Sequence, residues 1–202
     1  MIRAAERDRP DVAAARAEWA AGQAGLDPER LVFVDETWVK SNMTPAYGWG
    51  PTSERVVEAV PAGHWKTTTF VAALRASGLV APMVVDGAIT GELFVAYVEQ
   101  VLVKELRAGD LVVMDNLACH KVAKVAPAVE KAGAKVVYLP AYSPDLNPIE
   151  QVFAKTKGEI RKRKPRTVAD TETLCGDALD WFPPDECRNY IRHAGYGPQG
   201  TD

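Results

Sequence analysis

The sequence predicts an α/β fold in which a mixed five-stranded sheet is flanked by helices. Three short apolar segments rich in β-forming residues predict buried strands, because each is too short for a helix. Between and after them lie segments with apolar residues at helical spacing. This alternation requires parallel strands joined by right-handed crossovers. The strand segments are 31–36, 111–116 and 134–140, and the helical ones are 91–106, 122–133 and 147–163.

The other segments complete the sheet and its cover. Residues 66–87 predict two antiparallel strands around a turn at Ser77–Gly78. Residues 11–22 and 167–181 predict further helices. Residues 41–63 are rich in proline and glycine, which predicts a loop or irregular hairpin with a possible strand at 55–60.

Composition is that of an ordinary globular protein. The chain has 202 residues, of which 47% are hydrophobic and 25% charged. No apolar run is long enough for a membrane span, and the charged start is not a secretory signal. The three cysteines, Cys119, Cys175 and Cys187, are widely spaced and odd in number. We therefore expect reduced thiols in a cytoplasmic protein.

Positive charge is concentrated in one short segment. The net charge is −3, yet residues 155–166 carry seven lysines and arginines against one acid, Glu159. The segment is thus +6 and the rest of the chain −9. A basic stripe on an acidic body suits contact with a phosphate backbone. A solvated helix end would have the same composition, and charge alone does not separate the two interpretations.

Two aspartates occupy matched positions in two predicted strands. Alternation places Leu31, Phe33 and Asp35 on one face, and the strand at 111–116 places Asp115 in the same way. If the strands are parallel neighbours, the carboxylates lie side by side at the carboxyl ends, where open α/β sheets place their sites. Adjacent carboxylates repel unless a cation lies between them, and oxygen ligands suit Mg²⁺ or Mn²⁺. The alternative is that each aspartate caps the next turn.

Glu150 also has two interpretations. Asn147, Pro148 and Glu150 match a helix start, in which the acid bonds back to the cap residue. However, the spacing of the following helix places Glu150, Lys157 and Arg161 on one flank. There the carboxylate could hold a metal ion while the two cations follow a phosphate backbone.

Three blocks of this sequence resemble the catalytic blocks of mariner-superfamily transposases, in the bacterial insertion-sequence branch. The blocks are LVFVDETW, LVVMDNLACHK and YLPAYSPDLNPIEQVFAKTK, of which SPDLNPIE (143–150) is the most specific. The resemblance assigns the DDE acids to Asp35, Asp115 and Glu150, and the 34 residues between the last two match the spacing of that branch. It implies a ribonuclease-H-like fold that agrees with the element order above.

The resemblance further implies metal-dependent DNA strand cleavage and strand transfer. Two Mg²⁺ or Mn²⁺ ions would be held by the three acids. The partners would be double-stranded DNA and a second copy, as a homodimer on DNA. Residues 31–166 would form the catalytic core, between a helical connector at 1–30 and a helical extension at 167–202. The DNA-binding candidates are Lys157, Arg161, Lys162 and Lys164.

The chain departs from the family pattern at its start. Only about thirty residues precede Asp35, too few for the helix-turn-helix modules of mariner-like transposases. We therefore expect a catalytic half in a bacterial cell, joined by frameshifting to, or encoded apart from, a DNA-binding half. The alternatives are a non-catalytic DNA-binding or assembly remnant, which includes a truncated relic, and another ribonuclease-H-like nuclease.

Several residues near the acids have candidate auxiliary roles. His120 could touch the scissile phosphate or orient Asp115, or it could be a loop histidine. Asn116 could help hold the site, although capping the next turn is the commoner role. Glu36 is expected on the opposite face from Asp35, and Asp145 is expected to bond local amides. The tryptophans Trp38, Trp49 and Trp65 could stack on unpaired bases or pack within the protein.

Overall fold

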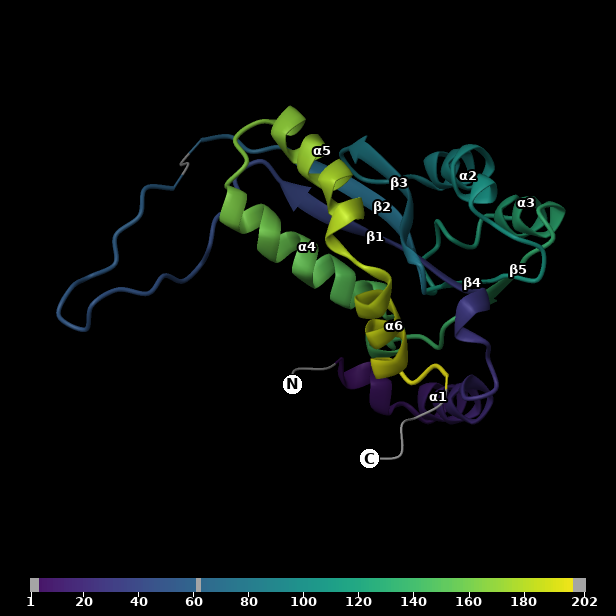
Figure 1. The fold of residues 1–202 in the computed structure, drawn as a ribbon. Helices are drawn as coiled ribbons and strands as arrows, with labels where there is room; N and C mark the ends of the chain where they lie inside the picture. The colour runs from purple at the N-terminus through teal and green to yellow at the C-terminus, as the bar shows by residue number, and fades with distance from the viewer. Residues whose placement is uncertain (1–3, 61–62, 198–202) are drawn as a thin grey trace.

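The computed structural model, which describes residues 4–60 and 63–197, contains one five-stranded sheet (Figure 1). The strands run in the spatial order β3-β2-β1-β4-β5. Only β2 runs against its neighbours, so the predicted mixed sheet flanked by helices is confirmed. The strands are β1 (Leu31–Lys40), β2 (Thr67–Arg75), β3 (Gly78–Asp86), β4 (Leu111–Met114) and β5 (Lys135–Tyr138).

The register of the two central strands determines where the aspartates lie. Strand β1 is parallel to β4, and Phe33 pairs with Val113. Asp35 and Asp115 each follow two residues after this pair, so the predicted side-by-side placement is confirmed. The prediction that both strands end at the aspartate holds only for β4. Strand β1 continues to Lys40 because its other edge stays paired with β2.

Helices cover both faces of the sheet (Figure 1). On one face α4, α5 and α6 pack on a core that contains Phe33, Phe70 and Phe153. On the other face α2 and α3 pack on Val34 and Val112. The helices are α1 (Pro10–Gln23), α2 (Gly91–Gln100), α3 (Val125–Lys131), α4 (Ile149–Arg163), α5 (Val168–Asp177) and α6 (Pro184–His193).

The helical segments expected from the sequence are present, although several are shorter than predicted. Helix α2 stops at Gln100 and is followed by a 3-10 turn, Leu102–Lys104. Helix α5 likewise gives way to a 3-10 turn, Ala178–Trp181. None of the helices in the described ranges is long and apolar enough to cross a membrane. All three cysteines are free thiols, as expected.

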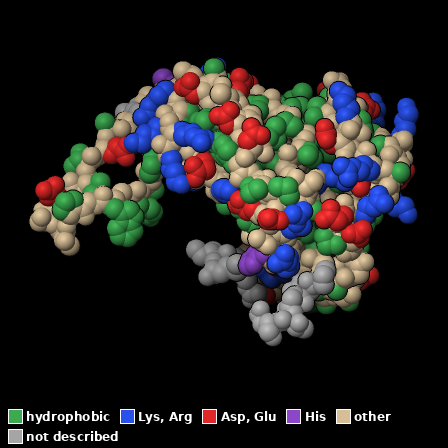
Figure 2. Space-filling model, viewed as in Figure 1, with side chains coloured by type: hydrophobic (Ala, Val, Ile, Leu, Met, Phe, Trp, Pro, Cys, Tyr) green, Lys and Arg blue, Asp and Glu red, His purple; other side chains and the backbone are tan. Residues whose placement is uncertain are grey.

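The segment between β1 and β2 forms an arm that extends away from the body (Figure 1). Its described residues, 41–60 and 63–66, form neither helix nor strand, so the possible strand at 55–60 is wrong. No neighbouring strand pairs with those residues, and their valines are exposed rather than packed. Figure 2 shows hydrophobic side chains at the far end of the arm. Tyr47, Trp49 and Val57 are among its most exposed residues.

Candidate active site

Asp35 and Asp115 line one cavity of about 440 Å³ at the carboxyl end of β4. Asn116 and Glu150 line the same cavity, together with the loop 139–144. The structure therefore brings together all three acids that the sequence singled out. They come from two neighbouring strands and from the first turn of a helix that packs across them.

Asp35 is the most buried of the three acids, with 6% of its surface exposed. Burial and the nearby charge of Asp115 raise its pKa well above the usual value for an aspartate. One oxygen, Oδ2, accepts a hydrogen bond of 2.8 Å from Asn147 Nδ2. The other, Oδ1, accepts from the Glu36 amide at 2.8 Å. The backbone and Asn147 thus fix the direction in which this carboxylate points.

Asp115 is held by a histidine instead. Burial alone would raise the pKa of Asp115, but contacts with His120 and the Leu117 amide outweigh it and lower the pKa. The Nδ1 atom of His120 lies 2.7 Å from Asp115 Oδ1, in ion-pair contact rather than in line for a hydrogen bond. The other ring nitrogen, Nε2, lies 2.8 Å from Glu36 Oε2. His120 therefore bridges two carboxylates.

The environment of His120 decides between its possible roles. The side chain is fully buried, and its ring packs on Phe94 with the centroids 4.4 Å apart. Burial alone would lower its pKa, but the contacts with Asp115 and Glu36 raise the pKa to about 9. The imidazolium is thus enclosed beside Asp115, which supports the orienting role and leaves no exposed surface to touch a phosphate. The Glu36 side chain lies on the far face from Asp35, as expected, where it contacts His120, and its charge adds to the raised pKa of Asp35.

Glu150 stands at the start of α4, exposed towards the cavity. Partial removal of the carboxyl group from water raises the pKa of Glu150, and the nearby charge of Lys157 opposes that shift. Burial lowers the pKa of Lys157, and Glu150 opposes that shift in turn. Because Arg161 also acts electrostatically on Lys157, the structure supports the predicted flank of one acid followed by two cations.

The helix start around Glu150 differs from the prediction in one respect. The first residue of α4 is Ile149, and no side chain caps the helix. The predicted capping role of Asn147 and Glu150 is therefore wrong, because the Asn147 amide is directed at Asp35 instead. Asn147 is buried, and its Oδ1 has no hydrogen-bond partner among the described residues. The asparagine in SPDLNPIE was visible in the sequence, but its long-range contact was not.

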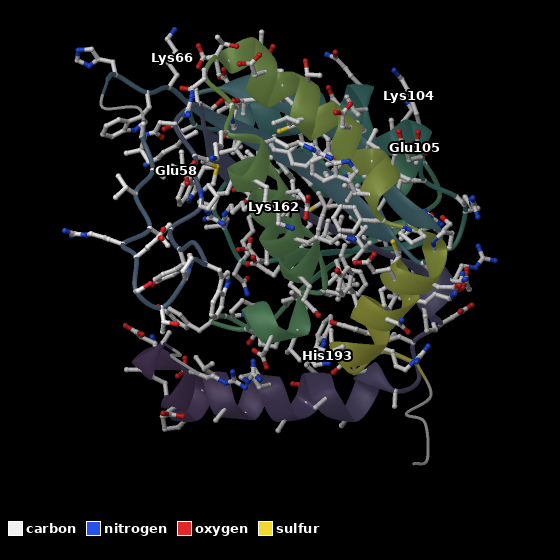
Figure 3. The ribbon with its side chains drawn as sticks, turned by 60° about the vertical axis from the view of Figure 1, so that its left-hand side comes forward. Glu58, Lys66, Lys104, Glu105, Lys162 and His193 are labelled. Carbon is white, nitrogen blue, oxygen red and sulfur yellow. The ribbon has the colours of Figure 1, made fainter. Side chains whose placement is uncertain are left out.

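The prediction for Asp145 missed its main partners, which are distant arginines and not the local amide. Arg16 donates to both carboxylate oxygens at 3.1 and 2.7 Å. Arg7 donates to the same two oxygens at 3.2 and 3.1 Å. Arg16 belongs to α1, which runs along the base of the body in Figure 3. Asp145 thus attaches the loop before Glu150 to α1 and to the 3-10 turn Ala5–Asp8 that precedes it.

Asn116 closes the cavity on the β5 side. Its Nδ2 donates to the Leu139 carbonyl, just past the end of β5. The expected capping of the next turn is performed by Asp115, whose Oδ1 accepts from the Leu117 amide at 2.9 Å. Asn116 therefore joins the ends of two neighbouring strands and does not cap the turn.

The basic candidates differ in their surroundings. Lys157 faces the groove beside Glu150. Lys162 pairs with Glu159 at 2.6 Å on the surface of α4. Lys164 follows the last turn of α4 with a left-handed backbone and pairs with Glu58 of the arm. Figure 3 shows Glu58 on the arm and Lys162 on α4.

Asp35 and Asp115 suit a divalent cation, whereas Glu150 lines the same cavity without joining their close group. Asp35 and Asp115 offer oxygens that lie close together, and a group of Asp35, Asp115 and His120 atoms falls within 4.8 Å of one another. The two ring nitrogens of His120 contact Asp115 and Glu36, and the carboxylates offer the oxygen ligands that Mg²⁺ and Mn²⁺ prefer. A cation would also relieve the repulsion that raises the pKa of Asp35.

Several solved structures of the mariner transposase Mos1 have a similar fold. The chain resembles the mariner Mos1 paired end complex with Mg, with a TM-score of 0.72 at 16% identity over 96% of this chain and 60% of that chain. The match to the Mos1 strand transfer complex has a TM-score of 0.71 and a sequence identity of 16%, and it covers 96% of this chain and 59% of that chain. The match to the Mos1 catalytic domain has a TM-score of 0.64 and a sequence identity of 15%, and it covers 96% of this chain and 89% of that chain. The fold is therefore ribonuclease-H-like, as expected.

The chain spans 59% of the Mos1 chain in the strand transfer complex, and 89% of the catalytic domain. No curated protein matches it in sequence. The family model described as DDE superfamily endonuclease matches residues 30–175, which include all three acids. The chain therefore belongs to the DDE superfamily of endonucleases.

Proposed function

We propose that this chain is the catalytic domain of a DDE-type transposase of the bacterial insertion-sequence branch. It would cleave DNA strands and join them to new DNA with two Mg²⁺ or Mn²⁺ ions. The observation that carries the proposal is the meeting of Asp35, Asp115 and Glu150 in one cavity. Such ions polarise a phosphoryl oxygen and generate a nucleophile from water or a DNA 3′-hydroxyl.

The residues of the chain have separate roles in this proposal. Asp35, Asp115 and Glu150 would hold the ions. Asn147 fixes the direction of Asp35, and His120 holds Asp115. The cations Lys157, Arg161, Lys162 and Lys164 would follow the DNA backbone, of which the first is nearest the acids.

We propose a homodimer on double-stranded DNA, because two element ends must be joined. Residues 31–166 would be the catalytic core, with 1–30 as connector and 167–202 as helical extension. Recognition of the element ends would come from a separate N-terminal half. The protein would act in the bacterial cytoplasm, on the nucleoid.

The test is nicking of supercoiled plasmid DNA in the presence of Mn²⁺. Wild type should convert supercoiled to open-circular DNA, and Asp115→Asn should abolish the conversion while DNA binding persists. Wild type that binds DNA without nicking it, with or without Mn²⁺, would instead favour a non-catalytic binding or assembly protein.

A further inference from the structure

Glu36, Cys119 and His120 form a second cluster of potential metal ligands, separate from the pair Asp35 and Asp115. One ligand atom from each of the three side chains lies within 4.8 Å of the other two. The Nε2 atom of His120 lies 2.8 Å from Glu36 Oε2, and the Sγ atom of Cys119 lies 4.0 Å from Glu36 Oε1. The cluster therefore combines a carboxylate oxygen, a thiol and an imidazole nitrogen.

The turn after β4 places both Cys119 and His120 beside Glu36 of β1. The His120 amide donates to the Leu117 carbonyl at 3.1 Å, which curls the chain directly after the strand. The His120 ring is then held against Phe94, with the ring centroids 4.4 Å apart. The fold thus holds the three ligand atoms close together before any ion binds, which lowers the cost of ordering them on binding.

This mixture of ligands suits Zn²⁺ better than Mg²⁺ or Mn²⁺. Zinc takes thiolate, imidazole and carboxylate ligands in a tetrahedral arrangement, whereas the harder ions prefer oxygen ligands. Around such an ion, a nitrogen and an oxygen ligand lie about 3.4 Å apart. The distance between His120 Nε2 and Glu36 Oε2, now 2.8 Å, would therefore need to grow by only about half an ångström.

An ion can reach this cluster without passing through the catalytic cavity. Glu36 and Cys119 are both partly exposed, and Glu36 lines a separate groove of about 700 Å³. Coordination would release the thiol proton and any proton on Nε2 of His120, because metal ligands bind in their deprotonated form. The other ring nitrogen, Nδ1, would stay 2.7 Å from Asp115 Oδ1. A carboxylate in that position commonly orients a metal-binding histidine.

We propose that Glu36, Cys119 and His120 bind Zn²⁺ at a site distinct from the DDE acids. Three protein ligands leave one position of the tetrahedron for a water molecule from the groove. The bound ion would fix the His120 ring and so support the orientation of Asp115. The proposal goes beyond the proposed function and is independent of it, because zinc binding here requires neither DNA nor strand cleavage.

The test is optical titration of reduced, metal-free protein with Co²⁺, which binds sites of this kind in place of Zn²⁺. Wild type should develop the near-ultraviolet absorption of a cobalt–thiolate bond, and Zn²⁺ should abolish it by displacing the cobalt. Cys119→Ser should lose the absorption, and both Cys119→Ser and Glu36→Gln should weaken Zn²⁺ binding by about tenfold or more. Cys187→Ser is the matched control and should behave as wild type, since a hydroxyl can keep the contact with the Phe182 carbonyl.

The outcomes separate this proposal from the proposed function. Wild type without cobalt–thiolate absorption, or absorption that survives Cys119→Ser, would overturn the zinc site. Zinc binding that is lost in Asp35→Asn but kept in Cys119→Ser would place the ion at the DDE acids and overturn it too. Mn²⁺ titration of zinc-free Cys119→Ser should give the wild-type affinity. Nicking of plasmid DNA by wild type would leave the proposed function standing in every case.

Discussion

The first two acids and the third are held in place by different parts of the molecule. Asp35 and Asp115 follow from the register of two neighbouring strands. Glu150 follows a loop whose position depends on Arg7 and Arg16, more than a hundred residues away in sequence. Strand register thus positions two of the proposed ligands, and the third depends on contacts with Arg7 and with Arg16 of α1.

The loop before Glu150 has a second attachment. Tyr196 donates to the Leu146 carbonyl at 2.8 Å. Trp19 of α1 in turn donates to the Tyr196 hydroxyl at 3.2 Å. Both chain ends therefore support the same loop, so residues proposed as a connector and an extension also belong to the architecture of the site.

The largest effect on Mn²⁺ affinity is expected for a substitution at His120, which supports Asp115 beside the sheet. His120→Phe keeps a ring against Phe94 but removes both nitrogens that hold Asp115 and Glu36. We expect Mn²⁺ affinity to fall about 10- to 100-fold, as is usual when a partner of a metal ligand is lost. Calorimetric titration measures it. The exposed His193→Phe is the control, and unchanged affinity in His120→Phe would show that Asp115 needs no support.

A smaller effect on Mn²⁺ affinity is expected for a substitution at Asp145, in the loop before Glu150. Asp145→Ala removes the shared partner of Arg7 and Arg16, a partly exposed cluster, so we expect a loss of about 1 kcal/mol in the free energy of unfolding. Mn²⁺ affinity should fall by a few-fold because Glu150 is less well placed. Asp11→Ala, which breaks the exposed pair with Arg9, should change neither quantity. Stability loss without any change in Mn²⁺ affinity would mean that the N-terminal helices do not position Glu150.

The smallest change is expected in thermal stability without metal, for Asp35→Asn. The folded-state pKa of Asp35 lies above its unfolded value, chiefly through burial. Its contribution to stability is therefore complete below the unfolded pKa and declines as pH rises through the folded pKa. Asp35→Asn should flatten that decline and raise Tm at neutral pH, since Asn147 Oδ1 is available to the new amide. A lower Tm at neutral pH would contradict the account.

Sequence pattern was sufficient for the parts of the site that depend on local order. The alternation of β1 and β4 placed Asp35 beside Asp115, and helical spacing placed Lys157 on the flank of Glu150. It failed for Asp145 and Asn147, whose contacts join residues 138 and 112 positions apart. Turn and cap propensities describe only near neighbours, so they assigned both residues to local hydrogen bonds.

The fold shows the same division. The strands that pair within the core were predicted correctly. The prediction of a strand at 55–60 was wrong, because β-forming valines need a partner strand and the described residues of the arm have none. The extent of β1 beyond Asp35 was also missed, since it depends on pairing with β2. That missed extension forms one side of the groove that Glu150 and Lys157 also line.

The most direct test of the central claim is calorimetric titration of Mn²⁺ into wild type, Asp35→Asn, Asp115→Asn and Glu150→Gln. If the three acids form one metal site, wild type binds and each substitution weakens binding by about tenfold or more. A substitution that leaves the affinity unchanged would remove that acid from the site. Wild type that binds no Mn²⁺, either alone or with DNA present, would contradict the account as a whole.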